Sequence, residues 1–451
     1  MTFLFFIYKP ILLKMKTIPR SPWLFPEEHA EVVQNLFDFG LLKFSNDRNL
    51  PLKSGGKTDV YINLRDARND PKAIKFITEL LARPLNHLHP ERFVEIPDSV
   101  SCFAGPLSIK TGIPYLTIRE KAKEGRVAIN ANVIGSPKQG EKICMIDDVI
   151  TDGASKIVPY GQCQILGLHN QSLIVLVDRQ QGWEKIFSDF GMDMNVWAGM
   201  TLHDVRRQLI ELGIMQRCNP VTEEKNPLIV ALDGKSWDDI LPIMDQLRTT
   251  GCILKVNDLL FNKGIEELIP DLSVYGRVMA DLKGHDIPNT VANTCKHLRD
   301  CPPWAVTVHA SGGEEMVKAA VETLKGTNTK VLPVTVLTSI DKTTCEEVYT
   351  RRPMEEVLTL AAIGNRAGAH GFVCSPEEVG ELSKLYPGKE FVTPGIRSGD
   401  NEKQDQNRTG TPKGAKESGA TKLVMGRQIL SAKDPVAEVM RILTEELEIV
   451  F

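Results

Sequence analysis

The sequence of 451 residues is too long for one ordinary domain, and two domains of roughly 200 residues each are the natural expectation. Its hydrophobic content of 42% and charged content of 25% are typical of a soluble globular protein, and a formal net charge of -4 gives no reason to expect nucleic acid or an anionic membrane as the main partner. The nine cysteines are odd in number and show no C-x-x-C spacing, which argues against a disulfide framework or a zinc site and favours a reducing, cytoplasmic setting.

The chain begins with the apolar stretch MTFLFFIYKPILLKMK. An export signal would have a basic segment before its apolar run and a small-residue cleavage site after it, whereas here Lys9 and Pro10 interrupt the run and neither feature is present. We therefore expect an extension without a fold of its own, with Met15 as an alternative start. No run of about 20 apolar residues occurs, so no membrane-spanning helix is expected.

Residues 26–215 alternate helix-like segments with short apolar runs. Amphipathic spacing predicts helices at 27–43 and 71–86, and the runs KICMIDD (142–148) and SLIVLVD (172–178) predict buried parallel strands. We therefore expect an N-terminal domain at 26–215 that is built as a parallel sheet flanked by helices.

The segment ICMIDDVITDGASK (143–156) joins an apolar strand to two acids and a glycine-bearing turn that should open a helix. Asp147 and Asp148 at the strand end can hold ribose hydroxyls and magnesium. An acidic pair before a glycine turn is only moderately specific by itself. The turn would offer backbone amides and hydroxyls to a phosphate at the helix N-terminus, through Thr151, Gly153, Ala154 and Ser155.

This segment resembles the 5-phosphoribosyl-1-diphosphate (PRPP) motif of type I phosphoribosyltransferases. Three others narrow the resemblance to orotate phosphoribosyltransferase: LKSGGKTDVYINLR (52–65) resembles its substrate segment, VDRQQG (177–182) its orotate-contacting strand end, and IREKAKEGR (118–126) its basic mobile loop. The resemblance implies a type I phosphoribosyltransferase fold that binds orotate and PRPP, with Mg²⁺ held mainly through PRPP near Asp147 and Asp148. It also implies five further residues that bind PRPP or orotate, namely Lys53, Arg119, Lys121, Lys123 and Arg179.

The basic loop departs from the family at several positions. A loop with three basic side chains suits closure over a diphosphate leaving group, and a solvated charged turn is the alternative. Glu120 follows Arg119, Glu124 and Gly125 stand where the family usually has a His or Tyr, and Asp152 places an acid beside the phosphate turn. We expect a transferase; the alternative is an N-terminal half that has lost catalysis and serves as a binding or dimerisation module.

The polar segment QRCNPVTEEKNP (216–227) has two prolines and no periodicity, and we expect a linker there. After it, eight apolar runs alternate with segments that are mostly long enough for a helix. This pattern predicts a (β/α)8 TIM barrel at 228–451, with its chemistry at the C-terminal ends of the strands. The runs are LIVALD (228–233), CILKV (252–256), VMADLK (278–283), AVTVHA (305–310), VLPVTVLT (331–338), GFVCS (371–375), EFVTPG (390–395) and KLVMGR (422–427).

The third run leads into MADLKGHDIPNT (279–290), which places Asp281, Lys283, His285 and Asp286 close together in the sequence. A structural salt-bridge network would explain such a cluster. A functional interpretation is that carboxylates fixed near a substrate carboxylate disfavour the bound acid, while an adjacent ammonium favours a developing carbanion and can donate a proton to it. This is the chemistry of decarboxylation without a cofactor.

The segment ADLKGHDIPNT closely resembles the motif of orotidine 5'-monophosphate decarboxylase, and the resemblance extends over 228–451. It implies that Lys255, Asp281, Lys283 and Asp286 are catalytic, that Lys283 protonates C6, and that Asp286 and Thr290 reach into the site of a partner subunit. It assigns the ribose to Asp233, the pyrimidine and ribose to VTVLTS, and the 5'-phosphate to TPGIR, DQNR and MGR, where barrels commonly hold phosphate. The implied nucleotide-binding residues are Asp233, Thr290, Thr338, Ser339, Pro394, Arg397, Gln406, Gly426 and Arg427.

Both halves together resemble the bifunctional uridine 5'-monophosphate (UMP) synthases of pyrimidine biosynthesis. The resemblance implies that the first half makes orotidine monophosphate from orotate and PRPP with magnesium, and that the second decarboxylates it to UMP without a cofactor. The expected partners are these small molecules and further copies of the chain, in a homodimer or higher homo-oligomer, with no nucleic acid and no membrane. A rival is another phosphosugar enzyme of the same barrel superfamily, in which D-x-K-x-x-D holds magnesium; DIPNT and the spacing from Arg397 to Gln406 argue against it.

Overall fold

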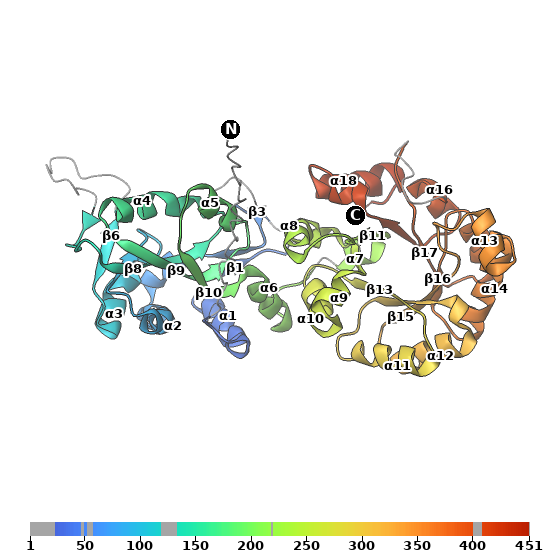
Figure 1. Cartoon of the computed structure of the whole chain (residues 1–451), viewed down its shortest axis with the longest axis horizontal. Coiled ribbons are helices and arrows are strands. Elements are labelled where there is room, and N and C mark those ends of the chain that lie inside the picture. The colour runs from blue at the N-terminus through green and yellow to red at the C-terminus, as the bar shows by residue number, and fades with distance from the viewer. Residues whose placement is uncertain are drawn as a thin grey trace, which may run out of the picture. The chain divides into compact units, whose positions relative to one another are not determined.

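The chain divides into two compact units, which we describe separately (Figure 1). The computed structural model describes residues 23–46, 49–51, 57–118, 133–217, 220–399 and 408–450. The first unit comprises Met1–Phe44 with Val60–Leu212, and the second comprises Ser45–Asp59 with Gly213–Phe451. Within the described residues, no helix combines the length and the hydropathy that a bilayer crossing requires.

The first unit is built on a six-stranded sheet in the order β10-β9-β8-β5-β6-β7. Every neighbouring pair is parallel except β6 and β7, so the parallel sheet expected from the sequence is present. A separate antiparallel pair joins β1 (Leu42–Phe44) to β4 (Val60–Ile62). The strands of the large sheet are β5 (Arg92–Glu95), β6 (Tyr115–Ile118), β7 (Val133–Ile134), β8 (Lys142–Ile150), β9 (His169–Asp178) and β10 (Asn195–Thr201).

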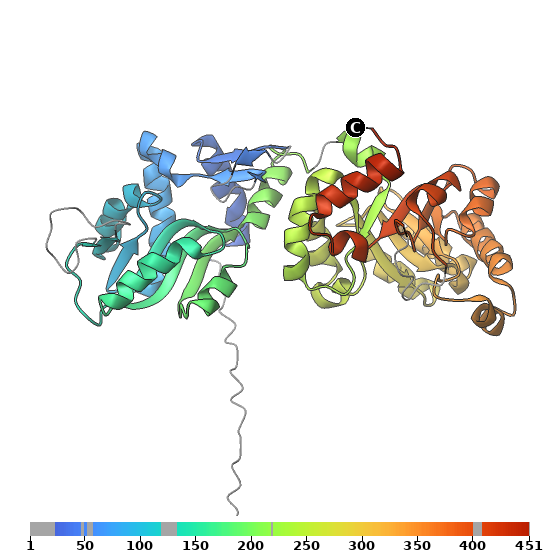
Figure 2. The same cartoon turned by 90° about the horizontal axis from the view of Figure 1, so that it is seen from above.

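Helices lie on both faces of this sheet, as the two views in Figures 1 and 2 show. The helix predicted at 71–86 is α2 (Pro71–Leu88). The helix predicted at 27–43 is shorter, because α1 (His29–Asp38) ends at Asp38 and residues 42–43 belong to β1. Asp70 caps the amide of Lys72, and Pro71 occupies the first position of α2, where its missing N–H costs nothing. The remaining helices are α3 (Ser101–Thr111), α4 (Ile157–Ile165), α5 (Trp183–Asp189) and α6 (Leu202–Glu211).

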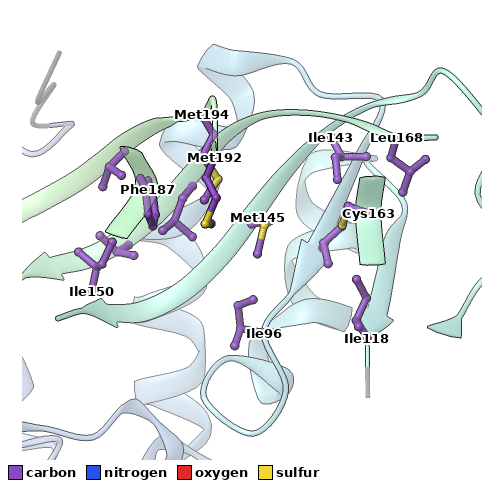
Figure 3. Close-up of a cluster of buried hydrophobic side chains, with 14 of the residues drawn as sticks. Ile96, Ile118, Ile143, Met145, Ile150, Cys163, Leu168, Phe187, Met192 and Met194 are labelled. Atoms are coloured by element: carbon purple, nitrogen blue, oxygen red, sulfur yellow. The ribbon is translucent and has the colours of Figure 1, made fainter. Parts of the chain in front are cut away.

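The core of the first unit lies against β8 and β9, which are apolar on both faces because helices cover both (Figure 3). Met145 of β8 lies within the cluster, and Trp183 and Phe187 of α5 are fully buried with ring centroids 5.0 Å apart. This core lies against the second half of β8, which carries the acidic pair and continues to Ile150.

The second unit contains a closed barrel of eight parallel strands, which confirms the predicted (β/α)8 architecture. Strand β11 pairs with β12 on one side and β18 on the other, so the sheet closes on itself. Apolar side chains fill the interior, among them Ile229, Ile253 and Leu332. The strands are β11 (Leu228–Ala231), β12 (Ile253–Val256), β13 (Val278–Gly284), β14 (Ala305–His309), β15 (Lys330–Val334), β16 (Gly371–Val373), β17 (Glu390–Thr393) and β18 (Lys422–Met425).

Helices surround this barrel, and one of them falls inside the segment expected as a linker. Helix α7 (Pro220–Lys225) lies within 216–227, where Glu223 pairs with both Arg217 and Arg277. A short charged helix of this kind has no apolar periodicity for the sequence to reveal. The others are α8 (Trp237–Leu247), α9 (Leu259–Lys263), α10 (Ile265–Ser273), α11 (Pro288–His297), α12 (Glu314–Leu324), α13 (Lys342–Tyr349), α14 (Pro353–Arg366), α15 (Val379–Leu385), α16 (Pro412–Glu417), α17 (Arg427–Leu430) and α18 (Pro435–Arg441).

Candidate active site

A cavity of about 1200 Å³ opens at the carboxyl ends of the barrel strands. Parallel strands in a barrel all end at the same face, so residues far apart in the sequence meet there. Nine of the residues expected from the sequence line this cavity. They are Asp233, Lys255, Asp281, Lys283, Thr338, Pro394, Arg397, Gly426 and Arg427.

Four of these residues, Asp233, Lys255, Asp281 and Lys283, form what we call the charged array. The ammonium of Lys255 pairs with the carboxylates of Asp233 and Asp281, at 3.0 Å from Asp281 Oδ2. The same Oδ2 lies 2.6 Å from Lys283 Nζ. Lys255 and Asp281 are 7% and 6% exposed, so Asp281 is a buried carboxylate between two ammonium groups.

Two neighbouring residues that the sequence did not single out hold Asp281 in place. The hydroxyl of Thr307 on β14 donates to Asp281 Oδ1 at 2.8 Å and accepts a hydrogen bond from the backbone N–H of Lys283 at 2.9 Å. The side chain of Asn257 donates to the backbone carbonyl of Asp281 at 2.6 Å. Thr307 is the third residue of an apolar run, and no sequence signal separates it from a core threonine.

The backbone at Lys283 is unusual. Its φ is +49°, a left-handed conformation that non-glycine residues seldom adopt and that clusters at functional sites. The pairing of β13 with β14 shifts register between Ala280 and Gly284. Asp281 and Lys283 are two residues apart in β13, and alternate residues of a strand lie on the same face, so both side chains face the cavity.

The array fixes the charges of its buried members. Burial would raise the pKa of Asp281, but the ammonium groups of Lys255 and Lys283 outweigh it and hold that pKa below its usual range. Burial would likewise lower the pKa of Lys255, but the carboxylates of Asp281 and Asp233 raise it. Near neutral pH the pair is therefore ionised on both sides.

The opposite side of the cavity carries two guanidinium groups, from Arg397 after β17 and Arg427 after β18. The buried Nη1 of Arg397 has no hydrogen-bond partner within the described residues, so it can donate to an anion in the cavity. The loop around it is held by backbone bonds from Arg397 N to Gly410 O at 3.0 Å and from Gly410 N to Gly395 O at 3.1 Å. Ser398 N also donates to Gln428 at 3.0 Å.

Arg408, from the motif DQNR, stabilises a segment of the cavity wall. It pairs with Glu378 and donates to the backbone carbonyls of Val336 and Leu337 at 2.9 and 2.8 Å. It therefore holds the segment that follows β15, which carries Thr338 into the cavity.

Several expected residues do not line this cavity. Asp286 and Thr290 are exposed near the start of α11, where Asp286 Oδ1 accepts only a local bond from Ile287 N among the interactions of the described residues. Ser339 is not among the lining residues. Gln406 lies outside the described residues.

In the first unit, the acidic pair lies within β8 and not at its end as expected, because the strand continues to Ile150 and pairs with β9 there. Lys156 forms an ion pair with Asp147, and Ser99 Oγ donates to Asp147 Oδ1 at 2.5 Å. Asp147 is thus buried and already neutralised, and it is not open to ribose hydroxyls in this arrangement. The sequence analysis could not have predicted this ion pair, because a spacing of nine residues between a lysine and an acid does not indicate a contact.

Asp148 lies beside this pair in a different electrostatic environment. Burial and the neighbouring Asp147 carboxylate raise the pKa of Asp148 to about 7, against the opposing effect of Lys156. A carboxylate in this position would gain from a nearby cation, and Mg²⁺ prefers such oxygen ligands. The part of the chain that the structure describes has no group of three or more His, Cys, Asp or Glu side chains that could hold a metal ion, so a cation here would have Asp148 as its carboxylate and would need the substrate for its other ligands.

The predicted phosphate turn follows the acidic pair. Gly153 has a φ of +82°, and a Cβ there would lie 2.9 Å from Phe187 Cε1, so the turn needs glycine. The Ala154 N–H, however, donates to Asp152 Oδ1 at 3.0 Å, and Thr151 Oγ1 lies 3.4 Å from the same oxygen. Asp152 thus competes for two donors that the sequence assigned to a phosphate.

The other expected transferase residues are only partly described. Arg179 is buried, and its Nη1 donates to the carbonyl of Val60 at 3.3 Å. Four basic residues lie outside the described residues, namely Lys53, Arg119, Lys121 and Lys123.

A closed (β/α)8 barrel with a charged array and two arginines around one cavity belongs to the class of barrel proteins that bind an anionic ligand at the strand ends. Residues 226–442 match the model of the Orotidine 5'-phosphate decarboxylase / HUMPS family. The orotidine 5'-phosphate decarboxylase of Chromobacterium violaceum is 40% identical over 230 residues, which are 50% of this chain and 92% of that protein. The chain therefore belongs to the orotidine 5'-phosphate decarboxylase family through its C-terminal half.

Two solved structures are also similar. The crystal structure of orotidine 5'-phosphate decarboxylase from Lactobacillus acidophilus is 38% identical and covers 49% of this chain and 98% of that one, with a TM-score of 0.43. The structure of Leishmania donovani UMP synthase is 26% identical and covers 43% of this chain and 40% of that one, with a TM-score of 0.37.

Replacing Asp281 tests the electrostatics of the array. Because the pKa of Asp281 is lowered on folding, its stabilising effect is present above its unfolded pKa and is lost as the pH falls through the folded value. Asp281→Asn should lower the free energy of unfolding by roughly 3 kcal/mol at pH 7, since it removes one partner of a buried ion pair. The deficit should be constant down to about pH 5 and should shrink below about pH 4.

Hydrogen exchange at the amides of β12 and β13 measures this deficit in the barrel itself. Asp300→Asn, at an exposed carboxylate, is the matched control and should cost little at any pH. A deficit that grows as the pH falls would contradict the ionised state of Asp281.

Proposed function

We propose that the barrel half decarboxylates orotidine 5'-monophosphate to UMP without a cofactor. The observation that carries this proposal is the position of Asp281 Oδ2 between the ammonium groups of Lys255 and Lys283, inside the cavity at the strand ends. Family membership supports it, because the relatives of the barrel half are orotidine 5'-phosphate decarboxylases.

The array suits this reaction because its charges are fixed before the substrate binds. A substrate carboxylate placed beside Asp281 is destabilised by the like charge, and that repulsion disappears as carbon dioxide leaves. The bond from C6 to the carboxyl carbon breaks, its electron pair stays on C6, and Lys283 Nζ transfers a proton to C6. Lys255 and Thr307 act as positioning residues, since they hold Asp281.

The rest of the cavity supports binding of the nucleotide. Arg397 and Arg427 would bind the 5'-phosphate, beside the backbone of Pro394 and Gly426. Asp233 would accept hydrogen bonds from the ribose hydroxyls, and Thr338 would contact the base and ribose, while we assign Ser339 and Gln406 to the same nucleotide by resemblance alone. Anchoring the phosphate away from the reacting carbon supplies binding energy that orients C6 at Lys283.

Replacement of Lys283 tests the proton donor. Lys283→Ala should reduce decarboxylation to less than about a hundredth of the wild-type rate, because a general acid contributes ~10²–10⁴-fold. The variant should still bind UMP, since the phosphate and ribose contacts lie elsewhere in the cavity. Carbon dioxide release and UMP titration measure the two effects, with the exposed Lys296→Ala as control. A Lys283→Ala enzyme that retains more activity would rule out this donor.

We also propose that the N-terminal half is an orotate phosphoribosyltransferase that supplies orotidine monophosphate. Its parallel sheet, the acids Asp147 and Asp148 in β8, and the glycine turn at Gly153 support this assignment. Magnesium bound to PRPP would neutralise charge on the diphosphate. We assign the contact with this substrate to Asp148, because Asp147 is held by Lys156.

A second candidate is an N-terminal half that binds without catalysing or that serves as a dimerisation module. The contacts that favour it are the ion pair between Lys156 and Asp147 and the bond from Ala154 N to Asp152, because both occupy groups that a transferase would present to PRPP.

Chelation of metal separates these alternatives. EDTA should stop orotate consumption by the full chain and leave decarboxylation of supplied orotidine monophosphate unchanged, because only the transferase half would use magnesium. Both rates can be followed by the absorbance of the pyrimidine, with excess Mg²⁺ restoring the first as a control. Absence of orotate consumption with magnesium would support the non-catalytic module, and a metal-dependent decarboxylation would favour the phosphosugar rival for the barrel.

We further propose that the decarboxylase sites are shared between two subunits of a homodimer. Asp286 and Thr290 are exposed and lie outside the lining of the cavity of their own chain, as residues would that complete a neighbour's site. In a two-fold dimer the same loop serves each partner's site reciprocally.

Mixing two inactive variants tests this sharing. Asp286→Asn and Lys283→Ala chains should each be inactive alone, but in a mixed dimer one site collects both lesions and the other collects neither. With random exchange, about a quarter of the wild-type activity should return if the sites are independent. Mass spectrometry of the mixture verifies exchange. Full exchange without recovered activity would mean that Asp286 serves its own chain.

A further inference from the structure

A second cavity, of about 400 Å³, lies at the opposite end of the barrel, among the residues that begin the strands. Lys330, Glu390 and Lys422 are the first residues of β15, β17 and β18. Trp304 and Arg277 directly precede β14 and β13. The lining residues are Glu223, Glu224, Arg277, Trp304, Lys330, Glu390 and Lys422. None of them has a role in the proposed reaction.

The two inner carboxylates of this cavity are already paired. Glu223 Oε1 lies 2.6 Å from Arg217 Nη2 and 3.5 Å from Arg277 Nε. Glu390 Oε1 lies 2.7 Å from Lys330 Nζ, and its Oε2 accepts a hydrogen bond from Thr421 at 2.9 Å. The third carboxylate, Glu224, is exposed at the edge.

Lys422 is the lining cation that takes part in neither of these ion pairs. Its side chain is 9% exposed, and Nζ donates to the backbone carbonyl of Asn226 at 3.3 Å, a long bond to a neutral acceptor. Burial and the positive charges of Arg277 and Lys330 lower the pKa of Lys422 to about 8, and Glu390 only partly opposes them. Among the described residues no carboxylate forms an ion pair with Lys422, so an anion in the cavity would stabilise its buried charge.

We propose that this cavity is a second binding site of the barrel, and that it takes a small multivalent oxyanion between Lys422, Arg277 and Lys330. The indole of Trp304, whose ring centroid lies 5.3 Å from Lys330 Nζ, forms the apolar wall beside it. Phosphate, sulfate and the carboxylates of a small diacid share the chemistry that these three donors recognise. The site does not depend on the function proposed for the other end of the barrel.

Sulfate is the probe of choice, because its own charge is constant between pH 7 and 9. Binding is measured by calorimetry on the full chain with Arg397→Ala and Arg427→Ala, which removes the two guanidinium groups of the other cavity. Lys422 is mostly protonated at pH 7 and mostly neutral at pH 9, given its pKa of about 8. The affinity for sulfate should therefore fall about tenfold between these pH values.

Substitutions at Lys422 decide the assignment. Lys422→Met should weaken sulfate binding at pH 7 by about tenfold or more and abolish its pH dependence, since it removes a charge-assisted hydrogen bond. Lys422→Arg should retain sulfate binding and lose its pH dependence. This variant distinguishes the effect of the positive charge from misfolding of the site. The exposed Lys384→Met is the control and should bind as the parent does.

The fluorescence of Trp304 locates the ion. Sulfate should change the emission of the parent, and Trp304→Phe should remove that change while leaving the calorimetric affinity within about twofold of the parent, because the indole is a wall and not a donor. Sulfate binding that Lys422→Met leaves unaltered, or no binding to the parent at pH 7, would overturn the proposal.

Discussion

The barrel site depends on one interaction, the ionised carboxylate of Asp281 held between the ammonium groups of Lys255 and Lys283. A carboxylate that is 6% exposed is costly to bury, and only compensation by two cations and the Thr307 hydroxyl keeps it charged. That compensation requires β12, β13 and β14 to be adjacent, so closure of the barrel and the chemistry of its cavity are one constraint. The left-handed backbone at Lys283 lies beside this interaction, where the pairing of β13 with β14 shifts register.

The charged side chains are paired differently at the two ends of the barrel. At the carboxyl ends, fixed charges of both signs surround an open cavity, and the buried Nη1 of Arg397 has no partner among the described residues. At the amino ends, Lys330 pairs with Glu390, whereas burial and the charges of Arg277 and Lys330 lower the pKa of Lys422. Unpaired donors and perturbed pKa values mark places where a ligand completes the electrostatics, whereas matched pairs contribute mainly to structure.

In the first unit, a few side chains occupy groups of the acidic pair and the glycine turn that follow from the sequence. Its core at Trp183 and Phe187 fixes the turn at Gly153, so the backbone is in place for an anion. Lys156, however, pairs with Asp147 of β8, and Asp152 accepts the N–H of Ala154 in the turn. Burial and the Asp147 carboxylate raise the pKa of Asp148, so a cation nearby would stabilise its charged form. An anion at this turn would have to displace the bond from Ala154 N to Asp152.

The sequence by itself determined the eight strands of the barrel, the parallel sheet, and the residues Lys255, Asp281, Lys283, Arg397 and Arg427 that meet at one cavity. It could do so because buried parallel strands are short continuous apolar runs, and because polar residues at their ends converge on one face. It missed Thr307 and Asn257, the ion pair of Lys156 with Asp147, and the cavity around Lys422. Only the tertiary structure decided these, because strand register, a φ of +49° at Lys283 and the ordering of charges in space leave no periodic trace in the chain.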